Sequence, residues 1–191
     1  MERSTASAQT SALSASSEST SESAERNGPC LLARAAGRLC ALPLANVFEV
    51  MRPLPIEPFP AMPPSVLGLS TIRGTPLPVV DLAQLVEPRP PVSGDASHGA
   101  PETRLTLSGR RFITIRTNDA SRIFALSVEA IERVGQLSGA AWESLPPLLN
   151  AGHSETIDAI GTLDMRVLLL LKASRLIDDQ TWNSIEKERR A

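Results

Sequence analysis

Short apolar runs separated by turn residues make up most of the chain after residue 28. Runs of this length, bounded by Gly, Pro, Asn, Asp or Ser, are typical of β-strands. Gly37 and Gly74 each lie between two consecutive runs and predict hairpins. The pattern therefore predicts an all-β protein with few helices, with strands expected at 30–36, 38–42, 47–51, 68–73, 75–82, 112–117, 122–128, 131–137, 156–163 and 166–171.

Three other segments break this rhythm. Residues 51–65 read MRPLPIEPFPAMPPS, where Pro is too frequent for a helix or a central strand. Pro, Ser and Gly also dominate 87–102, which places a linker at 87–111. Residues 1–28 consist mainly of Ser, Ala, Glu and Thr, and such a segment cannot bury enough apolar surface to offset its ordering entropy. It is expected to be a disordered tail.

The pattern changes again at the C-terminal end. Asp178 or Asp179 can cap a helix that carries Trp182 and Ile185 on one side and charged residues on the other. This arrangement predicts a C-terminal helix over 178–191, after the last strand.

An internal repeat links the two halves of the strand-rich region. RLCALPLANVFEVM (38–51) matches RIFALSVEAIERVG (122–135) at an offset of 84 positions, through identical or similar apolar residues. GLSTIRGTPLPVVDLAQLV (68–86) matches AIGTLDMRVLLLLKASRLI (159–177) at an offset of 91 positions. Two matches in the same order indicate a duplicated unit of about five strands.

The duplication predicts two small barrels packed together, a first at about 29–86 and a second at 112–177. Within them, LPLANVFEV and LSVEAIERV each predict a strand, a helical turn and another strand. A five-stranded barrel of fewer than about 70 residues has a thin core, so a shared apolar seam is expected and neither half should fold well alone.

Composition and charge exclude several functions. The chain has no Tyr and is only 3% aromatic, so it lacks the stacking platforms of single-stranded nucleic-acid binders. Without the tail, basic and acidic residues balance, whereas a nucleic-acid binder needs a cationic surplus. Cys30 and Cys40 lack the spacing of a zinc site and read as small buried side chains in facing strands. No apolar run approaches a membrane span, so a cytoplasmic protein without membrane insertion is expected.

The sequence contains almost no group of residues typical of a catalytic site. The only histidines are His98, in the linker, and His153, which lies beside Ser154, Glu155 and Asp158. No hydrolase, zinc or nucleotide-binding motif surrounds them, so no enzyme activity, catalytic residue, metal or cofactor is predicted. A small hydrolase using His153 and Ser154 remains the alternative from another class.

Two charged residues are candidates for binding a partner. Arg73 precedes the hairpin glycine, where a long cation can project from the rim of a barrel. Glu49 alternates with apolar residues in a short strand. Each also has a plain structural interpretation, as a turn residue whose stem covers apolar surface and as part of a solvated strand face.

The same segments resemble the CheW family, the adaptors of bacterial chemosensory arrays. The similar strings are LPLANVFEVMR, IEPFPAMPPSVLGLSTIRGTPLPVVDLAQL, RIFALSVEAIERV and RVLLLLKASRLI, which span nearly all of 30–177 in order. The resemblance implies a CheW-like domain over 29–177, with two five-stranded, SH3-like β-barrels sharing a core and no catalytic activity.

The resemblance also implies partners. CheW proteins bridge the cytoplasmic tip of a chemoreceptor and the regulatory domain of a CheA-type histidine kinase, at membrane-associated arrays. Val47, Glu49 and Arg73 match family positions linked to receptor binding, while kinase-binding residues cannot be placed.

The chain departs from the family pattern at Thr71, at the Asp164–Met165 turn and at Lys172, and its tail and linker are long. A CheW-like scaffold of another assembly, such as a pilus-based twitching system or polar localisation, is therefore the alternative within the binding class.

Overall fold

The structure is a computed structural model of the 191-residue chain. It describes residues 28–59, 62–88, 107–117, 122–137, 141–143 and 156–188. The predicted tail, most of the predicted linker, and both His98 and His153 lie outside the described residues.

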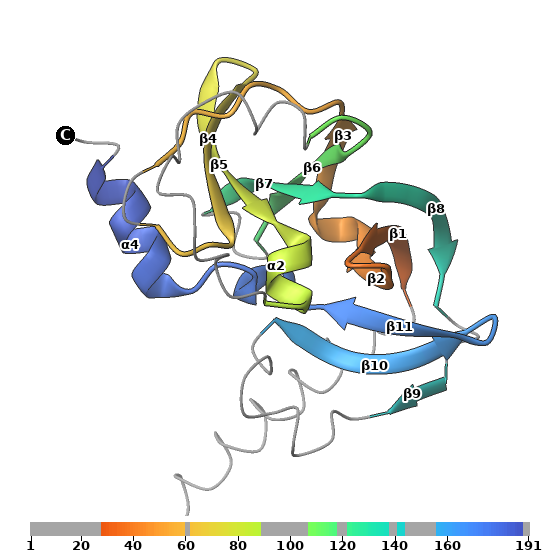
Figure 1. The fold of residues 1–191 in the computed structure, drawn as a ribbon. Coiled ribbons are helices and arrows are strands. Elements are labelled where there is room, and N and C mark those ends of the chain that lie inside the picture. The colour runs from red at the N-terminus through yellow and green to blue at the C-terminus, as the bar shows by residue number, and fades with distance from the viewer. Residues whose placement is uncertain are drawn as a thin grey trace, which may run out of the picture.

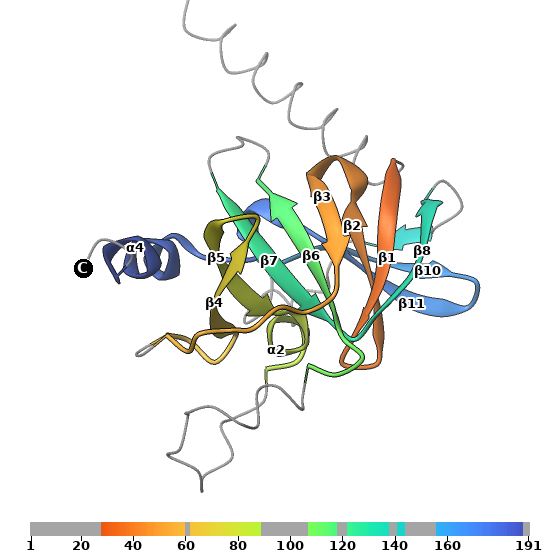
Figure 2. The same ribbon diagram turned by 90° about the horizontal axis from the view of Figure 1, so that it is seen from above.

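Two β-sheets form the body of the protein (Figures 1 and 2), as the all-β interpretation predicted. The six-stranded sheet has the order β8 (Ala130–Gln136), β1 (Pro29–Ala35), β2 (Arg38–Pro43), β11 (Arg166–Leu171), β10 (Ile157–Leu163) and β9 (Ala141–Glu143). The five-stranded sheet has the order β3 (Val47–Met51), β6 (Arg111–Arg116), β7 (Ile123–Val128), β5 (Thr75–Asp81) and β4 (Val66–Ile72).

The C-terminal helix is confirmed as α4 (Asp179–Glu188). Asp178 lies just before it and accepts hydrogen bonds from the backbone N–H and the hydroxyl of Thr181, at 2.8 Å and 2.7 Å. The helix packs through buried Trp182 and Ile185, and the Trp182 ring meets the ring of Phe124 edge-on, with centroids 6.2 Å apart. Strand β9 and the short helix α2 (Leu82–Val86) were not predicted.

Two sequential barrels at 29–86 and 112–177 would place the strands of each half of the chain in a sheet of their own. The strands are not divided in this way. Strands β1 and β2 belong to the six-stranded sheet with β8 to β11, whereas β3, β4 and β5 join β6 and β7 in the other sheet. Each sheet is therefore built from both halves of the chain. The reason is the topology: parallel pairing of β2 with β11 and of β5 with β7 crosses between the halves.

The duplication itself accounts for this exchange. At the offsets found in the sequence, β2 and β3 correspond to β7 and β8, while β4 and β5 correspond to β10 and β11. In the order β8-β1-β2-β11-β10, each strand can be replaced by its equivalent from the other half of the chain, with β1 taken as the equivalent of β6. The result is β3-β6-β7-β5-β4, which is the strand order of the five-stranded sheet. Register shifts recur at equivalent places too, between Val66 and Gly68 in β4 and between Ile157 and Ala159 in β10.

One predicted detail of the repeat holds only in the first unit. There, Leu44–Asn46 form the 3-10 turn η1 between β2 and β3. In the second unit, the expected helical turn in LSVEAIERV is wrong, because β7 and β8 are separated by Glu129 alone. The Glu129 N–H bonds to the Arg34 carbonyl at 2.9 Å, so the chain passes directly from one sheet to the other.

The departure at Lys172 has a structural consequence. Its equivalent, Asp81, ends β5 and accepts a hydrogen bond from the Ala83 N–H at 3.1 Å, which caps α2. Lys172 offers no side-chain cap, and only the 3-10 turn η2 (Ala173–Arg175) follows β11. A carboxylate satisfies free N–H groups at a helix start and an ammonium cannot, so an α-helix begins directly after β5 but not directly after β11.

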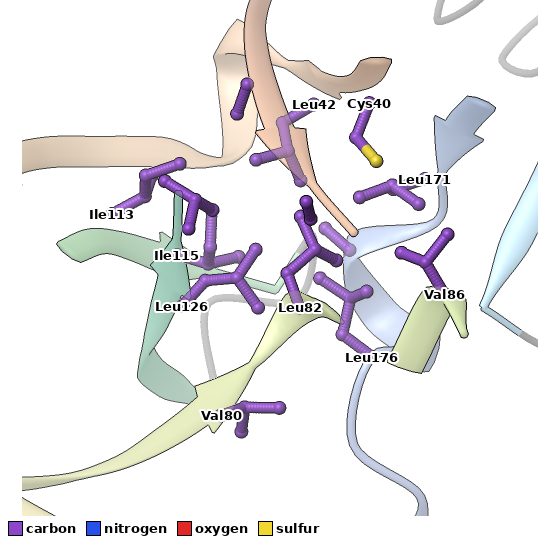
Figure 3. Packing of buried hydrophobic residues seen from close by; sticks show 14 of the residues in the cluster. Cys40, Leu42, Val80, Leu82, Val86, Ile113, Ile115, Leu126, Leu171 and Leu176 are labelled. Carbon is purple, nitrogen blue, oxygen red and sulfur yellow. The ribbon is translucent and has the colours of Figure 1, made fainter. Parts of the chain in front are cut away.

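Aliphatic side chains fill three buried clusters. The largest lies between the sheets and includes Leu42, Leu82, Ile113, Leu126 and Leu171 (Figure 3), which come from β2, α2, β6, β7 and β11. A second cluster belongs to the six-stranded sheet and a third to the five-stranded sheet, each on the side away from the shared cluster. The shared apolar seam is thus contributed by both sheets.

Cys30 and Cys40 are free, fully buried, and lie on the paired strands β1 and β2, as predicted. Burial raises the pKa of the Cys30 thiol to about 11 and that of Cys40 to about 12, so both thiols stay protonated at neutral pH. They act as small apolar side chains.

In its described residues, 51–59 and 62–65, the Pro-rich segment contains neither a helix nor a central strand, as expected, and it pairs with the sheet through Glu57. Glu57 and Leu69 exchange backbone hydrogen bonds of 2.8 Å and 2.9 Å. Gly68, at φ +142°, allows this approach, because a Cβ there would lie 2.1 Å from the Glu57 carbonyl oxygen.

Candidate partner-binding site

The β4–β5 turn presents Arg73 to solvent. Arg73 and Gly74 both have positive φ, at +51° and +79°, which is the pattern of a two-residue type I′ hairpin turn. The turn sets the Arg73 side chain beyond the ends of the strands, where 73% of it is exposed.

Glu49 meets Arg73 from the opposite edge of the same sheet. β3 and β4 are the two outer strands of the five-stranded sheet, yet the Glu49 carboxylate accepts three hydrogen bonds from the Arg73 guanidinium. Arg73 Nε lies 2.9 Å from Oε1 and 3.0 Å from Oε2, and Nη2 lies 2.6 Å from Oε2. The pair therefore joins the two edges at one end of the sheet.

The pairing fixes the charge of both groups. Hydrogen bonds from Arg73 lower the pKa of the Glu49 carboxyl, and those to Glu49 raise the pKa of Arg73. Because Arg73 is exposed, the pair contributes little to folding stability, as is usual for surface ion pairs. Its main effect is to hold a planar cation and an anion in a defined geometry at the surface.

Strand β3 places two of the three predicted residues, Val47 and Glu49, beside apolar neighbours. Val47 is half-buried and packs against the shared core, and Glu49 follows it after an irregularity in the β3–β6 pairing. The intervening Phe48 and the next residue, Val50, are 57% and 43% exposed. Sequence reasoning took Val47 and Glu49 as its candidates on this strand and missed these two, which alternate with them and lie on the other face of the edge strand.

A second arginine extends this surface. The guanidinium carbon of Arg116, on β6, lies 5.0 Å from the centre of the Phe48 ring, within the range of a cation–π contact. The structure thus brings together Val47, Glu49 and Arg73 with an exposed aromatic side chain and a further cation.

The aspartate of the PVVDL string has a structural role. Besides capping α2, Asp81 forms an ion pair with Arg110, whose Nη2 also lies 3.5 Å from the Ser127 carbonyl oxygen. Both charged side chains are largely buried. This pair ties the start of β6 to the end of β5 and so supports the sheet behind the Arg73 hairpin.

The described residues offer little for chemistry other than binding. They contain no group of three His, Cys, Asp or Glu able to hold a metal ion. Of the cluster behind the hydrolase alternative, only Asp158 is described, on β10; His153, Ser154 and Glu155 lie outside the described residues. No helix in this part of the chain is both long and apolar enough to cross a membrane.

The family model for the CheW-like domain matches residues 29–181. The chain belongs to the CheW-like domain family. A similar solved structure is the crystal structure of the scaffolding protein TtCheW from Thermoanaerobacter tengcongensis, with a TM-score of 0.58 and 20% sequence identity over 76% of this chain and 89% of that one. A search among curated proteins gives no match. As a CheW-like domain, the protein is a non-enzymatic scaffold with an all-β CheW fold.

Proposed function

We propose that this CheW-like scaffold couples chemoreceptors to a CheA-type histidine kinase, and that Val47, Glu49 and Arg73 contact the cytoplasmic tip of the receptor. The observation that carries the proposal is the Glu49–Arg73 pair, held by three hydrogen bonds at an exposed end of the five-stranded sheet. The scaffold would work in the cytoplasm, at membrane-associated arrays.

The geometry suits recognition better than stabilisation. An ion pair this exposed adds little to stability, and Glu49 engages only Nε and Nη2 of Arg73. The second terminal nitrogen, Nη1, can therefore donate to an oxygen of the receptor. Phe48 and Val50 supply apolar surface on the same strand, and such a mixture of an apolar centre and placed charges is typical of protein interfaces.

The coupling would be mechanical. Both sheets pack on one buried cluster, and each contains strands from both halves of the chain, so the two sheets are expected to move together. A rigid scaffold that holds receptor and kinase in a fixed arrangement lets receptor motion favour one kinase conformation over another. The proposal assigns no residue to the kinase contact.

A receptor pull-down with charge variants tests the site. Arg73→Glu is expected to abolish capture of the receptor's cytoplasmic tip while leaving the thermal transition within about 2 °C of wild type. Arg38→Glu is the matched control, since Arg38 is another exposed arginine, 3.9 Å from Glu87, and it should bind normally. Unchanged receptor binding by Arg73→Glu would refute the site.

A double variant separates recognition from structure. Glu49→Arg combined with Arg73→Glu rebuilds the ion pair with its charges exchanged, so any structural role of the pair is restored. If receptor binding depends on the sign of the charge at each position, the double variant should still fail to bind. Recovery of binding would show that the pair acts only by stabilising the fold.

The long linker and tail favour one alternative, a CheW-like scaffold serving a pilus-based twitching system or polar localisation. Co-purification from the native cell distinguishes the two. A CheA-type kinase among the captured proteins supports the proposal, and its absence from a preparation containing other partners supports the alternative.

A further inference from the structure

Three strand hydroxyls of the five-stranded sheet are buried without a hydrogen-bond partner. In the described part of the chain they are Ser70 Oγ, Thr114 Oγ1 and Ser127 Oγ. Strand alternation places all three on the side of the third cluster, since each lies two residues from one of its members, Ile72, Phe112 or Ala125. A buried hydroxyl without a partner is unfavourable, so apolar side chains would suit these positions better unless the hydroxyls are used.

Thr114 differs from the two serines in what lies opposite it. It pairs directly with Glu49 across the antiparallel strands β3 and β6 (Figure 2), whereas neither serine lies opposite a residue of the partner-binding site. Directly opposed residues of an antiparallel pair share one face of the sheet, with Cβ atoms about 4.5 to 5.5 Å apart. Rotation about the side-chain bonds of Glu49 therefore brings its carboxylate within reach of the Thr114 hydroxyl.

Glu49 needs a hydrogen-bond donor because its side chain is largely buried. Only 17% of it is exposed, against 73% of the Arg73 side chain, and Arg73 donates three hydrogen bonds to its carboxylate. A buried carboxylate that loses its donors is strongly disfavoured. The pair can therefore open only if another group replaces Arg73, and the Thr114 hydroxyl is a donor that is not engaged elsewhere.

The internal repeat offers a comparison within the same molecule. Arg133 corresponds to Glu49 at the offset of 84 positions, and it forms an ion pair with Asp164, with Nη2 and Oδ2 3.2 Å apart. The residue directly opposite Arg133 is Leu32, which is fully buried. An apolar side chain thus serves the fold at this place, and Thr114 stands there only in the sheet whose strand residue is an anion. A hydroxyl can donate to a carboxylate, which accounts for the difference.

We propose that Thr114 is a positioning residue of the partner-binding site, whose hydroxyl becomes the donor to the Glu49 carboxylate when a partner draws Arg73 away. In the closed arrangement of the structure, Glu49 occupies Nε and Nη2 of Arg73. In the open arrangement, Thr114 holds Glu49 in place as an anion. Nε and Nη2 are then free, together with Nη1, to bind oxygen atoms of the partner. Only the identity of that partner rests on the proposed receptor function.

NMR titration of the Glu49 carboxyl carbon in the full chain tests the exchange of donors. Arg73→Ala opens the pair. In that background, Thr114→Val should raise the pKa of Glu49 further, because a hydrogen bond to the carboxylate stabilises its charged form. With Arg73 present, the same substitution should leave the pKa of Glu49 at its wild-type value. An effect confined to the open background identifies Thr114 as the replacement donor.

Two substitutions control for packing and polarity. Thr114→Ser keeps a hydroxyl, so in the Arg73→Ala background the pKa of Glu49 should stay as it is in Arg73→Ala alone. Ser70→Ala removes another buried hydroxyl of the same sheet and should have no effect on this pKa. Circular dichroism melting shows that each variant is folded, and Thr114→Ala replaces Thr114→Val if the latter is not.

The proposal is overturned if Thr114→Val leaves the pKa of Glu49 unchanged in the Arg73→Ala background. It is also overturned if Thr114→Ser raises that pKa as much as Thr114→Val does, since the hydroxyl would then not be the cause.

Receptor capture provides the second measurement. With Arg73 intact, Thr114→Val should weaken capture of the receptor's cytoplasmic tip about three- to tenfold, the usual contribution of one hydrogen bond, and Ser70→Ala should capture like wild type. Capture that needs Arg73 but not Thr114 overturns the proposal. Capture that does not need Arg73, with the pKa of Glu49 still dependent on Thr114, refutes the receptor site alone and supports the exchange of donors.

Discussion

The β4–β5 and β10–β11 hairpins occupy equivalent places in the two sheets and differ most at their turns. One turn combines a cation with a glycine, Arg73–Gly74, and the other combines an anion with an exposed apolar residue, Asp164–Met165. Behind the turns, the strands share their pairing order and their bulges. The buried interior of the duplicated unit thus determines the fold. The hairpin turns, by contrast, can vary in charge and polarity without disturbing it.

The largest effect should follow from separating the two halves. Residues 29–90 contain β1 to β5, whose partners β6, β7, β8 and β11 lie in the other half. Alone, this fragment is expected to lack a cooperative thermal transition, because neither sheet can form and the shared cluster loses one side. Circular dichroism and calorimetry measure this, with the full chain as control. Cooperative unfolding of 29–90 would show that a half is sufficient.

Shortening a side chain in the shared buried cluster should lower the unfolding free energy more than shortening an exposed side chain. Leu126 is fully buried between the sheets, so Leu126→Ala is expected to cost about 2 to 5 kcal/mol of unfolding free energy. Val134 is 59% exposed, and Val134→Ala should change stability by less than about 0.5 kcal/mol. Urea denaturation compares the two, and similar losses would contradict the separation between buried interior and exposed surface.

Exchanging the turn residues tests the backbone difference between the hairpins. Met165→Gly removes the strain of a left-handed conformation, which costs an L-residue about 1 to 2 kcal/mol. Glycine also increases the conformational entropy of the unfolded chain, which cancels part of this gain in stability. A net gain of about 0.5 to 1 kcal/mol is expected. Gly74→Met should cost a similar amount. Denaturation midpoints measure both changes; equal signs for the two substitutions would refute this account of the turns.

The smallest effect concerns pH. The pKa of the Glu49 carboxyl is lowered by its hydrogen bonds from Arg73, so the ionised pair contributes fully above the ordinary pKa of glutamate. That contribution disappears as the pH falls through the lowered pKa. NMR titration of the carboxyl carbon should show the pKa of Glu49 rising in Arg73→Gln. An unchanged pKa would mean that the two groups are not paired in solution.

Much of the fold could be predicted because it depends on local patterns. Glycines between apolar runs located the hairpins, Asp178 marked the start of α4, and the repeat indicated duplication. The exchange of strands between sheets could not be predicted, since parallel pairs such as β2–β11 join residues far apart in the chain. The short helix α2 was missed because only a local cap at Asp81 distinguishes it from a continuing strand.

The candidate site was predictable in part for the same reason. Glu49 and Arg73 stood out by residue type and turn position, but their pairing across 24 residues depends on the sheet bringing its edges together. Phe48 looked like an ordinary strand residue, and its exposure depends on which face of β3 is turned away from the rest of the protein. Arg133 and Asp164 were visible in the aligned repeat, where their reversed charges could have been noticed by comparing equivalent positions.

The most direct test of the partner-binding account is NMR mapping of the full chain with a receptor cytoplasmic tip. Backbone amide shifts are expected on β3 and at the β4–β5 turn, around Val47, Glu49 and Arg73. Arg133 and Asp164, which occupy the equivalent positions in the six-stranded sheet, should stay unchanged. Shifts centred on Arg133 and Asp164, or no shifts at either pair, would contradict the assignment of the Glu49–Arg73 surface to the receptor.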